Sequence, residues 1–269
     1  MNIGIISLGL IGGSILKALN ECDYTIYAVT RNKTVIEQAK KYTKNVSNDY
    51  KTLSDCDVIF VASPINKTLE ILDILEPIVK PECIVIDCAS VKEFVMKKQR
   101  PYKFIGSHPM AGTENNGFEA SFKELFNGAK WVLTPSDNIN EKDIETVKKV
   151  IEKTHAQIII TNPKDHDLAV ALISHMPLLL SQALFNTVSD NDLALKLASS
   201  GFRDMTRLAL SNLEMAEDMR NFNAENIDIS KEKLISSINF LKNTKDLKIF
   251  ADIKNVRKSM YSNEGKNIL

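Results

Sequence analysis

The sequence lacks the features that mark several common protein classes. It has only four cysteines, none in a C-x-x-C pair, and no signal peptide precedes the apolar segment that starts at residue 2. This argues against a disulfide scaffold and favours a reduced, cytoplasmic location. Neither sign of charge is in excess, with 34 basic and 34 acidic residues, so nucleic acid is not an expected partner. No apolar run approaches the roughly 20 residues that cross a bilayer, so we expect no membrane partner and a small-molecule ligand instead.

What the sequence does contain is enough apolar material for two domains. The chain has 269 residues, 44% of them hydrophobic, and chains of this length commonly divide in two. Up to about residue 160, helical patterns alternate with apolar runs, which are Ile3–Ile6, Thr25–Val29, Val58–Ala62, Cys83–Ile86, Phe104–Gly106, Trp131–Leu133 and Ile158–Ile160. Continuously apolar runs predict strands buried on both faces. We therefore expect a doubly wound, Rossmann-type α/β domain over residues 1–162.

The remainder, residues 163–269, has no further strand-like run and is expected to be all helical. His166 to Asn186 is apolar nearly all round, which indicates a buried helix that needs neighbours on every side. One small helical domain hardly supplies them, so we expect a homodimer formed through this domain. Ile229 to Arg257 has the amphipathic spacing of outer helices.

The first apolar run ends in a turn suited to a nucleotide. The segment Ser7-Leu-Gly-Leu-Ile-Gly12 leads into a helical pattern, and glycines between a strand and a helix N-terminus let a pyrophosphate approach the backbone. We predict cofactor contacts from Ser7, Gly9, Leu10, Ile11 and Gly12. Ser7 stands where the dinucleotide-binding fingerprint G-x-G-x-x-G has its first glycine, so Ser7 must make the same tight turn. An ordinary β-α turn is the alternative interpretation.

The end of the second run indicates which dinucleotide binds. A carboxylate there would bond a ribose hydroxyl, but the chain has Thr30, Arg31 and Lys33. A hydroxyl and two cations suit a phosphate monoester, so NADP is favoured over NAD. The alternative is that both cations are merely solvated loop residues.

His108 is the candidate acid-base residue. It is one of four histidines and follows an apolar run, where the strand ends of an open α/β sheet line a ligand crevice. A structural histidine fits the position equally well. Asp165, His166 and Asp167 suggest a metal site, but neighbouring helix residues point in different directions, so no metal is expected.

Five motifs in order give the chain a family resemblance. They are the glycine turn; Asp87-Cys-Ala-Ser90-Val-Lys92; Gly106-Ser-His108-Pro-Met; the histidines of His166-Asp167 and Ser174-His175-Met-Pro177; and Ser199-Ser-Gly-Phe-Arg203-Asp-Met-Thr-Arg207. Together they resemble the prephenate/arogenate dehydrogenases of tyrosine biosynthesis over nearly the whole chain, with the NADP-using arogenate branch most similar.

The resemblance implies an enzyme and a reaction. A cyclohexadienol, prephenate or arogenate, loses hydride to NADP or NAD and then loses carbon dioxide to become a phenol. His108 corresponds to the base, and Ser90 to a serine near the nicotinamide; the alternative for Ser90 is a helix N-cap. Arg207 corresponds to the arginine that binds the substrate carboxylate. The remaining implied residues are Arg203, His175, His166 and Glu114 at the substrate, and Ser63 and Pro64 at the cofactor.

One departure leaves the substrate open. Family members that use prephenate often carry a histidine just after the proline that corresponds to Pro177. This chain has Leu178 there. Two other functions compete with the dehydrogenase. A β-hydroxyacid or imine dehydrogenase would be expected to have a catalytic lysine where this chain has His175, and a dinucleotide-binding module without catalysis would leave His108 and Arg207 unexplained.

Overall fold

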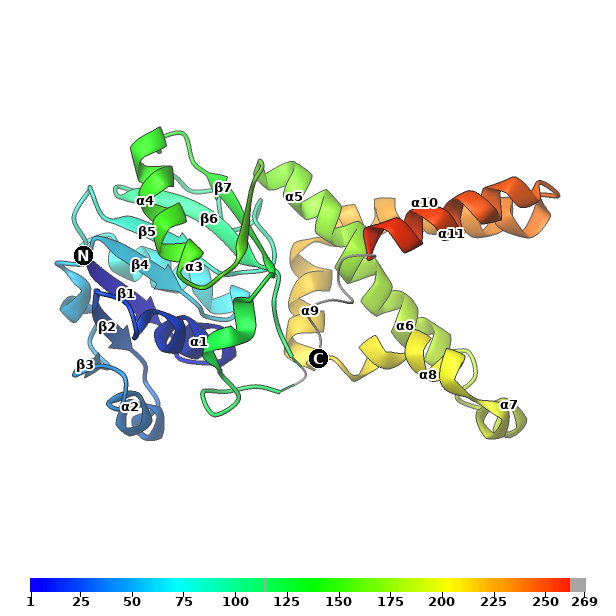
Figure 1. Ribbon diagram of the computed structural model, residues 1–269, viewed down its shortest axis with the longest axis horizontal. Helices are drawn as coiled ribbons and strands as arrows, with labels where there is room; N and C mark the ends of the chain where they lie inside the picture. Colours follow the sequence, from blue (N-terminus) through cyan, green and yellow to red (C-terminus); the bar gives the residue numbers. More distant parts are fainter. Residues whose placement is uncertain (114, 262–269) are drawn as a thin grey trace. The chain divides into compact units, whose positions relative to one another are not determined.

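One large mixed sheet forms the first half of the chain. The structure, a computed structural model, describes residues 1–113 and 115–261. The sheet has eight strands in the order β3-β2-β1-β4-β5-β6-β7-β8, and every neighbouring pair is parallel except β6 and β7 (Figure 1). The strands are β1 (Asn2–Ile6), β2 (Thr25–Val29), β3 (Asn45–Ser47), β4 (Val58–Val61), β5 (Ile84–Asp87), β6 (Lys103–Pro109), β7 (Lys130–Pro135) and β8 (Gln157–Ile160).

Each of the seven predicted apolar runs forms a strand, and the predicted Rossmann-type architecture is confirmed. The prediction that every run is buried on both faces was wrong for the last run, Ile158–Ile160. Ile159 and Ile160 in β8 are 44% and 49% exposed, because β8 is an edge strand. The sequence analysis also missed β3, whose three residues include only one apolar side chain.

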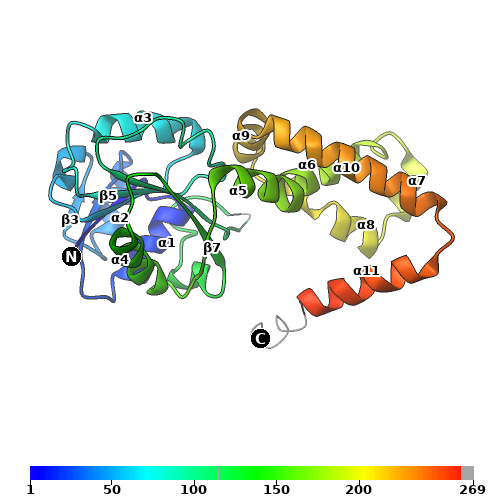
Figure 2. The ribbon, with the colours of Figure 1, turned by 90° about the horizontal axis from the view of Figure 1, so that it is seen from above.

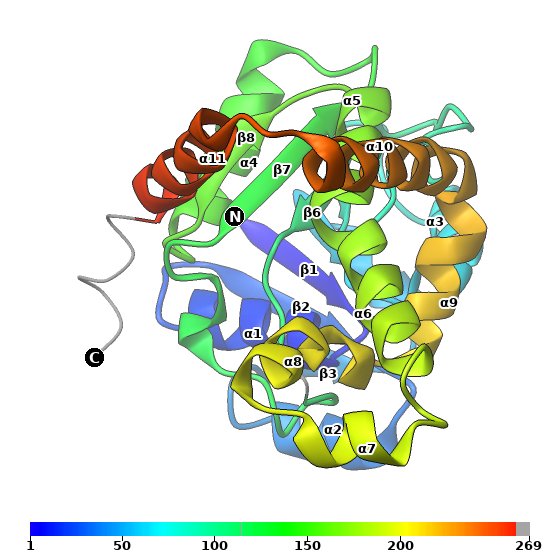
Figure 3. The ribbon, with the colours of Figure 1, turned by 90° about the vertical axis from the view of Figure 1, so that its right-hand side faces the viewer.

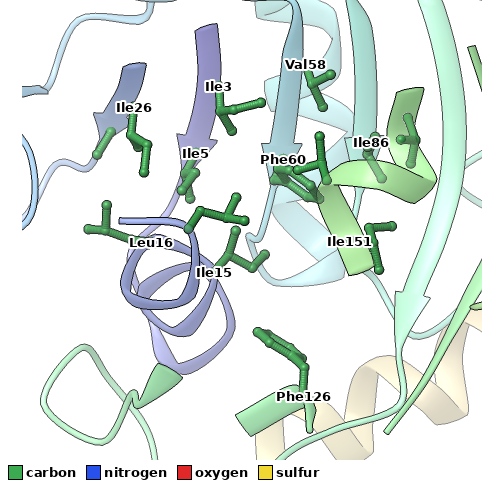
Figure 4. Close-up of a cluster of buried hydrophobic side chains, with 14 of the residues drawn as sticks. Ile3, Ile5, Ile15, Leu16, Ile26, Val58, Phe60, Ile86, Phe126 and Ile151 are labelled. Carbon is green, nitrogen blue, oxygen red and sulfur yellow. The ribbon is translucent and has the colours of Figure 1, made fainter. Parts of the chain in front are cut away.

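Helices cover both faces of the sheet, as a doubly wound fold requires. One face packs against α1 (Leu10–Leu19) and α4 (Glu141–Glu152), and the other packs against α3 (Ile65–Leu75). Figure 2 shows α3 on one side of the sheet and α1 and α4 on the other. The short α2 (Lys33–Ala39) adds Ala39 to the first face. In Figure 4, Ile15 and Leu16 of α1 and Ile151 of α4 lie beneath Ile5 and Phe60.

The second half is helical, as predicted. Asn162 caps the first helix by accepting the backbone N–H of Asp165, and the elements that follow are α5 (Pro163–Val170), a π-helical turn η3 (Ala171–His175), α6 (Met176–Asn186), α7 (Asp192–Leu197), α8 (Ser200–Met205), the 3-10 turn η4 (Arg207–Leu210) and α9 (Leu213–Phe222). Two further 3-10 turns, η1 (Tyr50–Leu53) and η2 (Lys123–Phe126), lie in the first half. Figure 3 shows α8 beside α6, and the N–H of Ala209 donates to the Ser181 hydroxyl.

The long helix expected to be buried is only partly covered within one chain. Ile173 is 68% exposed, and Leu172 and Phe185 are exposed as well. Contrary to the sequence analysis, the continuous helical stretch Pro163–Asn186 is long and apolar enough to cross a membrane, with a window of mean hydropathy 1.8. One such helix is weak evidence for a membrane, because core helices of soluble proteins have the same composition.

The chain divides into two compact units, Met1–Ile227 and Asp228–Leu269. The second unit contains most of α10 (Ala224–Asn243) and all of α11 (Leu247–Met260). Asp246 caps α11 by accepting the backbone N–H of Lys248. The helices predicted over residues 229–257 are therefore confirmed.

Candidate active site

The carboxyl edge of the sheet brings together residues that lie far apart in the sequence. The parallel strands β1, β2, β4, β5 and β6 all end there, and β1 and β4 lie at the centre of the six strands that run from β3 to β6 in the sheet order. The predicted residues at or just beyond these strand ends are Ser7, Thr30, Ser63, Ser90 and His108. Ligands of open α/β sheets bind outside this edge, so the five residues lie where such a ligand is expected.

The turn after β1 has the shape expected of a phosphate cradle. Ser7 adopts a left-handed backbone conformation, with φ of 68°, so it makes the tight turn required of it. A Cβ on Gly12 would lie 2.1 Å from the Ser7 carbonyl oxygen, whereas a Cβ on Gly9 would meet nothing within 4 Å. No side chain caps the N-terminus of α1. Its free N–H groups, including those of Ile11 and Gly12, can therefore receive an anion.

The residues after β2 leave two cations available. Thr30 is buried, while Arg31 and Lys33 are exposed and make no hydrogen bond or ion pair within residues 1–113 and 115–261. Asn32 between them caps α2 by accepting the N–H groups of Thr34 and Val35.

The residues after β4 are positioned differently. The Ser63 hydroxyl lies 3.0 Å from the Thr68 hydroxyl in a buried contact. Pro64 is exposed and stands at the N-cap position of α3.

Ser90 does not begin a helix, so its predicted alternative role as an N-cap was wrong. The segment after β5 consists of bends and turns. In this segment the backbone N–H groups of Lys92 and Glu93 donate to the carboxylate of Asp167 at 2.7 and 2.8 Å. A side chain from α5 thus satisfies the backbone that a helix would otherwise satisfy. Ser90 is half-buried, three residues after the end of β5.

His108 belongs to a chain of three side chains. It lies within β6, which is longer than predicted, and is half-buried. Its Nδ1 is 3.0 Å from Nε2 of His166, and Nδ1 of His166 is 2.7 Å from Oδ1 of Asp167. His166 and Asp167 are both buried. Both ring nitrogens of His166 are therefore occupied by protein groups, which leaves none to bind a substrate directly.

Burial sets the protonation state of the histidines. Desolvation lowers the pKa of His108 well below its ordinary value, and His166, Lys92 and His175 add to this lowering. Desolvation also lowers the pKa of His175 to about 4. Both imidazoles are therefore neutral near neutral pH, the state that a general base requires.

His175 is held at one nitrogen only. Its Nδ1 lies 3.1 Å from the amide nitrogen of Asn223, which also donates to the carbonyl oxygen of Asp167. Its Nε2 is buried and has no partner among the described residues. Sequence reasoning missed Asn223, because no local pattern connects it to a histidine 48 positions away.

A fully buried ion pair lies behind the site and was also missed. The ammonium of Lys92 pairs with Asp87, at the end of β5, and donates to the carbonyl oxygen of Ser107, the residue before His108. The other oxygen of Asp87 accepts the N–H of Ser107 at 3.0 Å. The pair therefore fastens the end of β5 to β6 next to His108.

The predicted arginines stand apart from this network. Arg203 is exposed and approaches Asp204 at 3.4 Å, while the exposed Arg207 makes no hydrogen bond or ion pair with any described residue. The two arginines do not share one helix, because α8 ends at Met205 and Arg207 begins η4. Leu178 is buried in α6. Glu114 lies outside the described residues.

No metal centre is apparent in the part of the chain that the structure describes. Within those ranges, no group of three or more His, Cys, Asp or Glu side chains is placed to hold an ion.

Two family models match nearly the whole chain. Residues 15–160 match the nucleotide-binding domain of prephenate dehydrogenase, and residues 162–248 match the prephenate dehydrogenase dimerization domain.

Named relatives agree with these matches. The chain is 30% identical to a cyclohexadienyl dehydrogenase of Zymomonas mobilis over 83% of itself and 81% of the relative. It is 27% identical to a prephenate dehydrogenase of Bacillus subtilis over 82% of itself, but it spans only 63% of that protein's length.

Solved structures share the fold over the full chain. The arogenate dehydrogenase of Synechocystis matches with a TM-score of 0.80 and 30% identity, covering 100% of both chains. The prephenate dehydrogenase of Aquifex aeolicus, solved with hydroxyphenyl propionate and NAD+, matches with a TM-score of 0.79 and 28% identity, covering 99% of this chain and 96% of that one.

Proposed function

The chain belongs to the prephenate dehydrogenase family, and on that premise we propose that it oxidises and decarboxylates prephenate or arogenate with a nicotinamide dinucleotide. The observation that carries the proposal is the position of His108. A half-buried imidazole with a lowered pKa stands at the same sheet edge as a nucleotide turn. That arrangement suits removal of a hydroxyl proton next to a hydride acceptor.

The cofactor would lie on the turn from Ser7 to Gly12 and reach toward Ser63, Pro64 and Ser90. The open space at Gly9 and the uncapped helix N-terminus fit a pyrophosphate. A nicotinamide held there would supply the acceptor for the hydride that leaves C4 of the substrate ring. NADP is the favoured form, because Arg31 and Lys33, beside Thr30, have no hydrogen-bond or ion-pair partner among the described residues. NAD is the alternative, and the Aquifex aeolicus relative was solved with it.

The chemistry asked of the protein is a proton transfer. His108 takes the proton of the C4 hydroxyl as hydride leaves, which gives a ring ketone with a carboxylate beside the diene. Carbon dioxide then departs, its bonding electrons move into the ring, and the oxygen takes the proton back from His108 to become a phenol. His175, whose buried Nε2 has no hydrogen-bond partner among the described residues, is proposed to contact the substrate, and Ser90 to stand near the substrate hydroxyl.

The substrate carboxylate requires a fixed cation, and Arg207 is the proposed one, with Arg203 as a further candidate. Glu114 is proposed as an acidic residue at the substrate site that can pair with the substrate-binding arginine. Arg207 has no partner among the described residues, and the surrounding helices expose large apolar side chains. We propose that a second copy packs on this surface and completes the substrate region. The proposed functional domains are 1–162 and 163–269, and the proposed location is the cytoplasm.

The test is an absorbance assay of nicotinamide reduction with prephenate and arogenate, each against NAD+ and NADP+. We expect reduction with at least one of the ring substrates and a preference for NADP+. His108→Asn is expected to lower kcat by about 1,000-fold, with the dissociation constant of the cofactor unchanged. Cofactor binding without turnover of either substrate would favour the non-catalytic module, and turnover of a small hydroxyacid or imine instead would favour the rival dehydrogenases.

A further inference from the structure

The carboxylate of Asp167 accepts three hydrogen bonds. Oδ1 accepts the N–H of Lys92 at 2.7 Å and faces Nδ1 of His166 at 2.7 Å, while Oδ2 accepts the N–H of Glu93 at 2.8 Å. The side chain is only 1% exposed. A carboxylate held by backbone donors has no proton to give. Nδ1 of His166 must therefore carry the hydrogen of that contact.

The hydrogen on His166 determines the hydrogen on His108. A neutral imidazole with a proton on Nδ1 has a lone pair on Nε2. Nε2 of His166 lies 3.0 Å from Nδ1 of His108, and the two rings meet edge to face with an interplanar angle of 72°. Nδ1 of His108 must then be the donor in this contact. Its Nε2 is left with the lone pair.

We propose that Asp167 and His166 are a positioning pair that fixes His108 in the Nδ1–H tautomer, so that Nε2 is the atom that accepts the substrate proton. The identity of that proton donor rests on the proposed function, but the arrangement of hydrogens does not. His166 thereby changes from a predicted substrate-binding residue to one that acts through His108.

The buried charges around the pair favour this assignment. Lys92 is matched by Asp87, whereas Asp167 forms no ion pair with a Lys or Arg of the described chain. The carboxylate of Asp167 is therefore left to His166 and to the backbone donors of Lys92 and Glu93. When His108 takes a proton, its new positive charge is linked through His166 to that carboxylate. The groups facing His108 from the neighbouring elements are His166, Lys92 and His175.

His175 provides an internal contrast. The amide nitrogen of Asn223 donates to Nδ1 of His175, and the amide oxygen of Asn223 accepts from Asn226 at 2.8 Å. The Asn223 amide is therefore fixed in orientation, and Nδ1 of His175 is an acceptor. His175 has the opposite tautomer, with its hydrogen on Nε2.

The direct test is a long-range proton–nitrogen NMR spectrum of the full chain labelled with ¹⁵N-histidine, without cofactor, at neutral pH. Only four histidines are present, so His→Asn variants assign the signals. We expect a protonated Nδ1 and an unprotonated Nε2 for His108 and His166, and the reverse for His175. A protonated Nε2 on His108 would overturn the proposal. Because the spectrum needs no turnover, an inactive chain with the expected spectrum would count against the proposed function alone.

Two variants separate positioning from folding. In His166→Gln the amide oxygen can still accept from His108, whereas His166→Phe removes the acceptor. We expect kcat to fall by about 10-fold in the first and about 100-fold in the second, with KM within about threefold of wild type. The Phe variant should also show both tautomers of His108 in the spectrum. Equal losses in kcat with an unchanged His108 spectrum would overturn the proposal.

Discussion

The two halves of the chain differ in how far they bury their own apolar residues. Ile5 in β1 and Val85 in β5 are completely buried, as are most apolar side chains of the central strands. In the helical half, Leu210 is 83% and Leu213 is 78% exposed. A sheet covered by helices on both faces closes its core within one chain. The helices after residue 162 instead expose an apolar surface, which only a second molecule can shield from water.

The largest expected effect is on the stability of the sheet half, from a substitution at Gly12. A Cβ there would meet the Ser7 carbonyl oxygen, so Gly12→Ala must move α1 away from β1. We expect the free energy of unfolding to fall by about 3 kcal/mol and cofactor binding to be lost. Urea denaturation and calorimetric titration with NADP+ measure the two effects.

Gly9→Ala is the matched control. A Cβ at Gly9 meets nothing within the chain, so the free energy of unfolding should change by less than about 0.5 kcal/mol, while cofactor affinity falls. If both variants lost the same stability, close packing would not distinguish these two positions.

The exposed surface of the helical half can be tested at Leu210. If a second copy covers it, Leu210→Asp buries a charge and should weaken the dimer by at least about 2 kcal/mol, or roughly 30-fold in dissociation constant. Light scattering across a dilution series measures the mass. Phe122→Asp, at a 40% exposed position of the sheet half, should leave the mass unchanged. A wild-type chain that stays monomeric at all concentrations would contradict the comparison between the halves.

Substitution of Arg207, whose guanidinium has no partner among the described residues, has a smaller expected effect. Arg207→Gln removes a charge-assisted hydrogen bond to the substrate, so KM should rise by about 20-fold, with cofactor affinity unchanged. Arg203→Gln serves as the control, because Arg203 already approaches Asp204, and should change KM by less than about threefold. A larger effect at Arg203 would exchange the two roles.

The smallest expected effect is in the pH profile of kcat/KM. This profile tests whether the two halves together keep His108 buried. Neutral His108 is the active form, so activity falls as the pH drops through its pKa. Burial lowers that pKa, and kcat/KM should therefore hold nearly constant through pH about 6.5, where an exposed imidazole titrates, and fall only below it. A loss centred near pH 6.5 in initial-rate assays would indicate that water reaches the ring.

The strands were predictable because apolar β-branched runs can hardly fold otherwise in a covered sheet. The run before Ser7 and the run Thr25–Val29 appear nearly residue for residue as β1 and β2. Exposure of Ile159 and Ile160 was not predictable, because the same apolar run occurs in central and edge strands. The helix expected after Ser90 does not form, and the local sequence could not show this. The backbone N–H groups of the segment donate to Asp167, which is 75 positions away from Lys92.

Of the candidate site, the sequence indicated the position of His108 at a strand end and the turn after β1. The partners of His108 could not be found in this way. Lys92 and Asp167 look like ordinary charged residues in the sequence, and only the packing of α5 against the segment after β5 gives them their buried contacts. Side chains whose function depends on a distant element have no local signature.

The left-handed backbone of Ser7 has a consequence for engineering. A serine in the left-handed backbone conformation destabilises the folded state by a conformational energy on the order of 1 kcal/mol, which glycine does not incur. Replacement by glycine would restore the usual dinucleotide fingerprint and release that energy. Directed evolution of this protein for heat tolerance should therefore recover glycine at this position early, and the retained serine marks a place where the natural chain stops short of its attainable melting temperature.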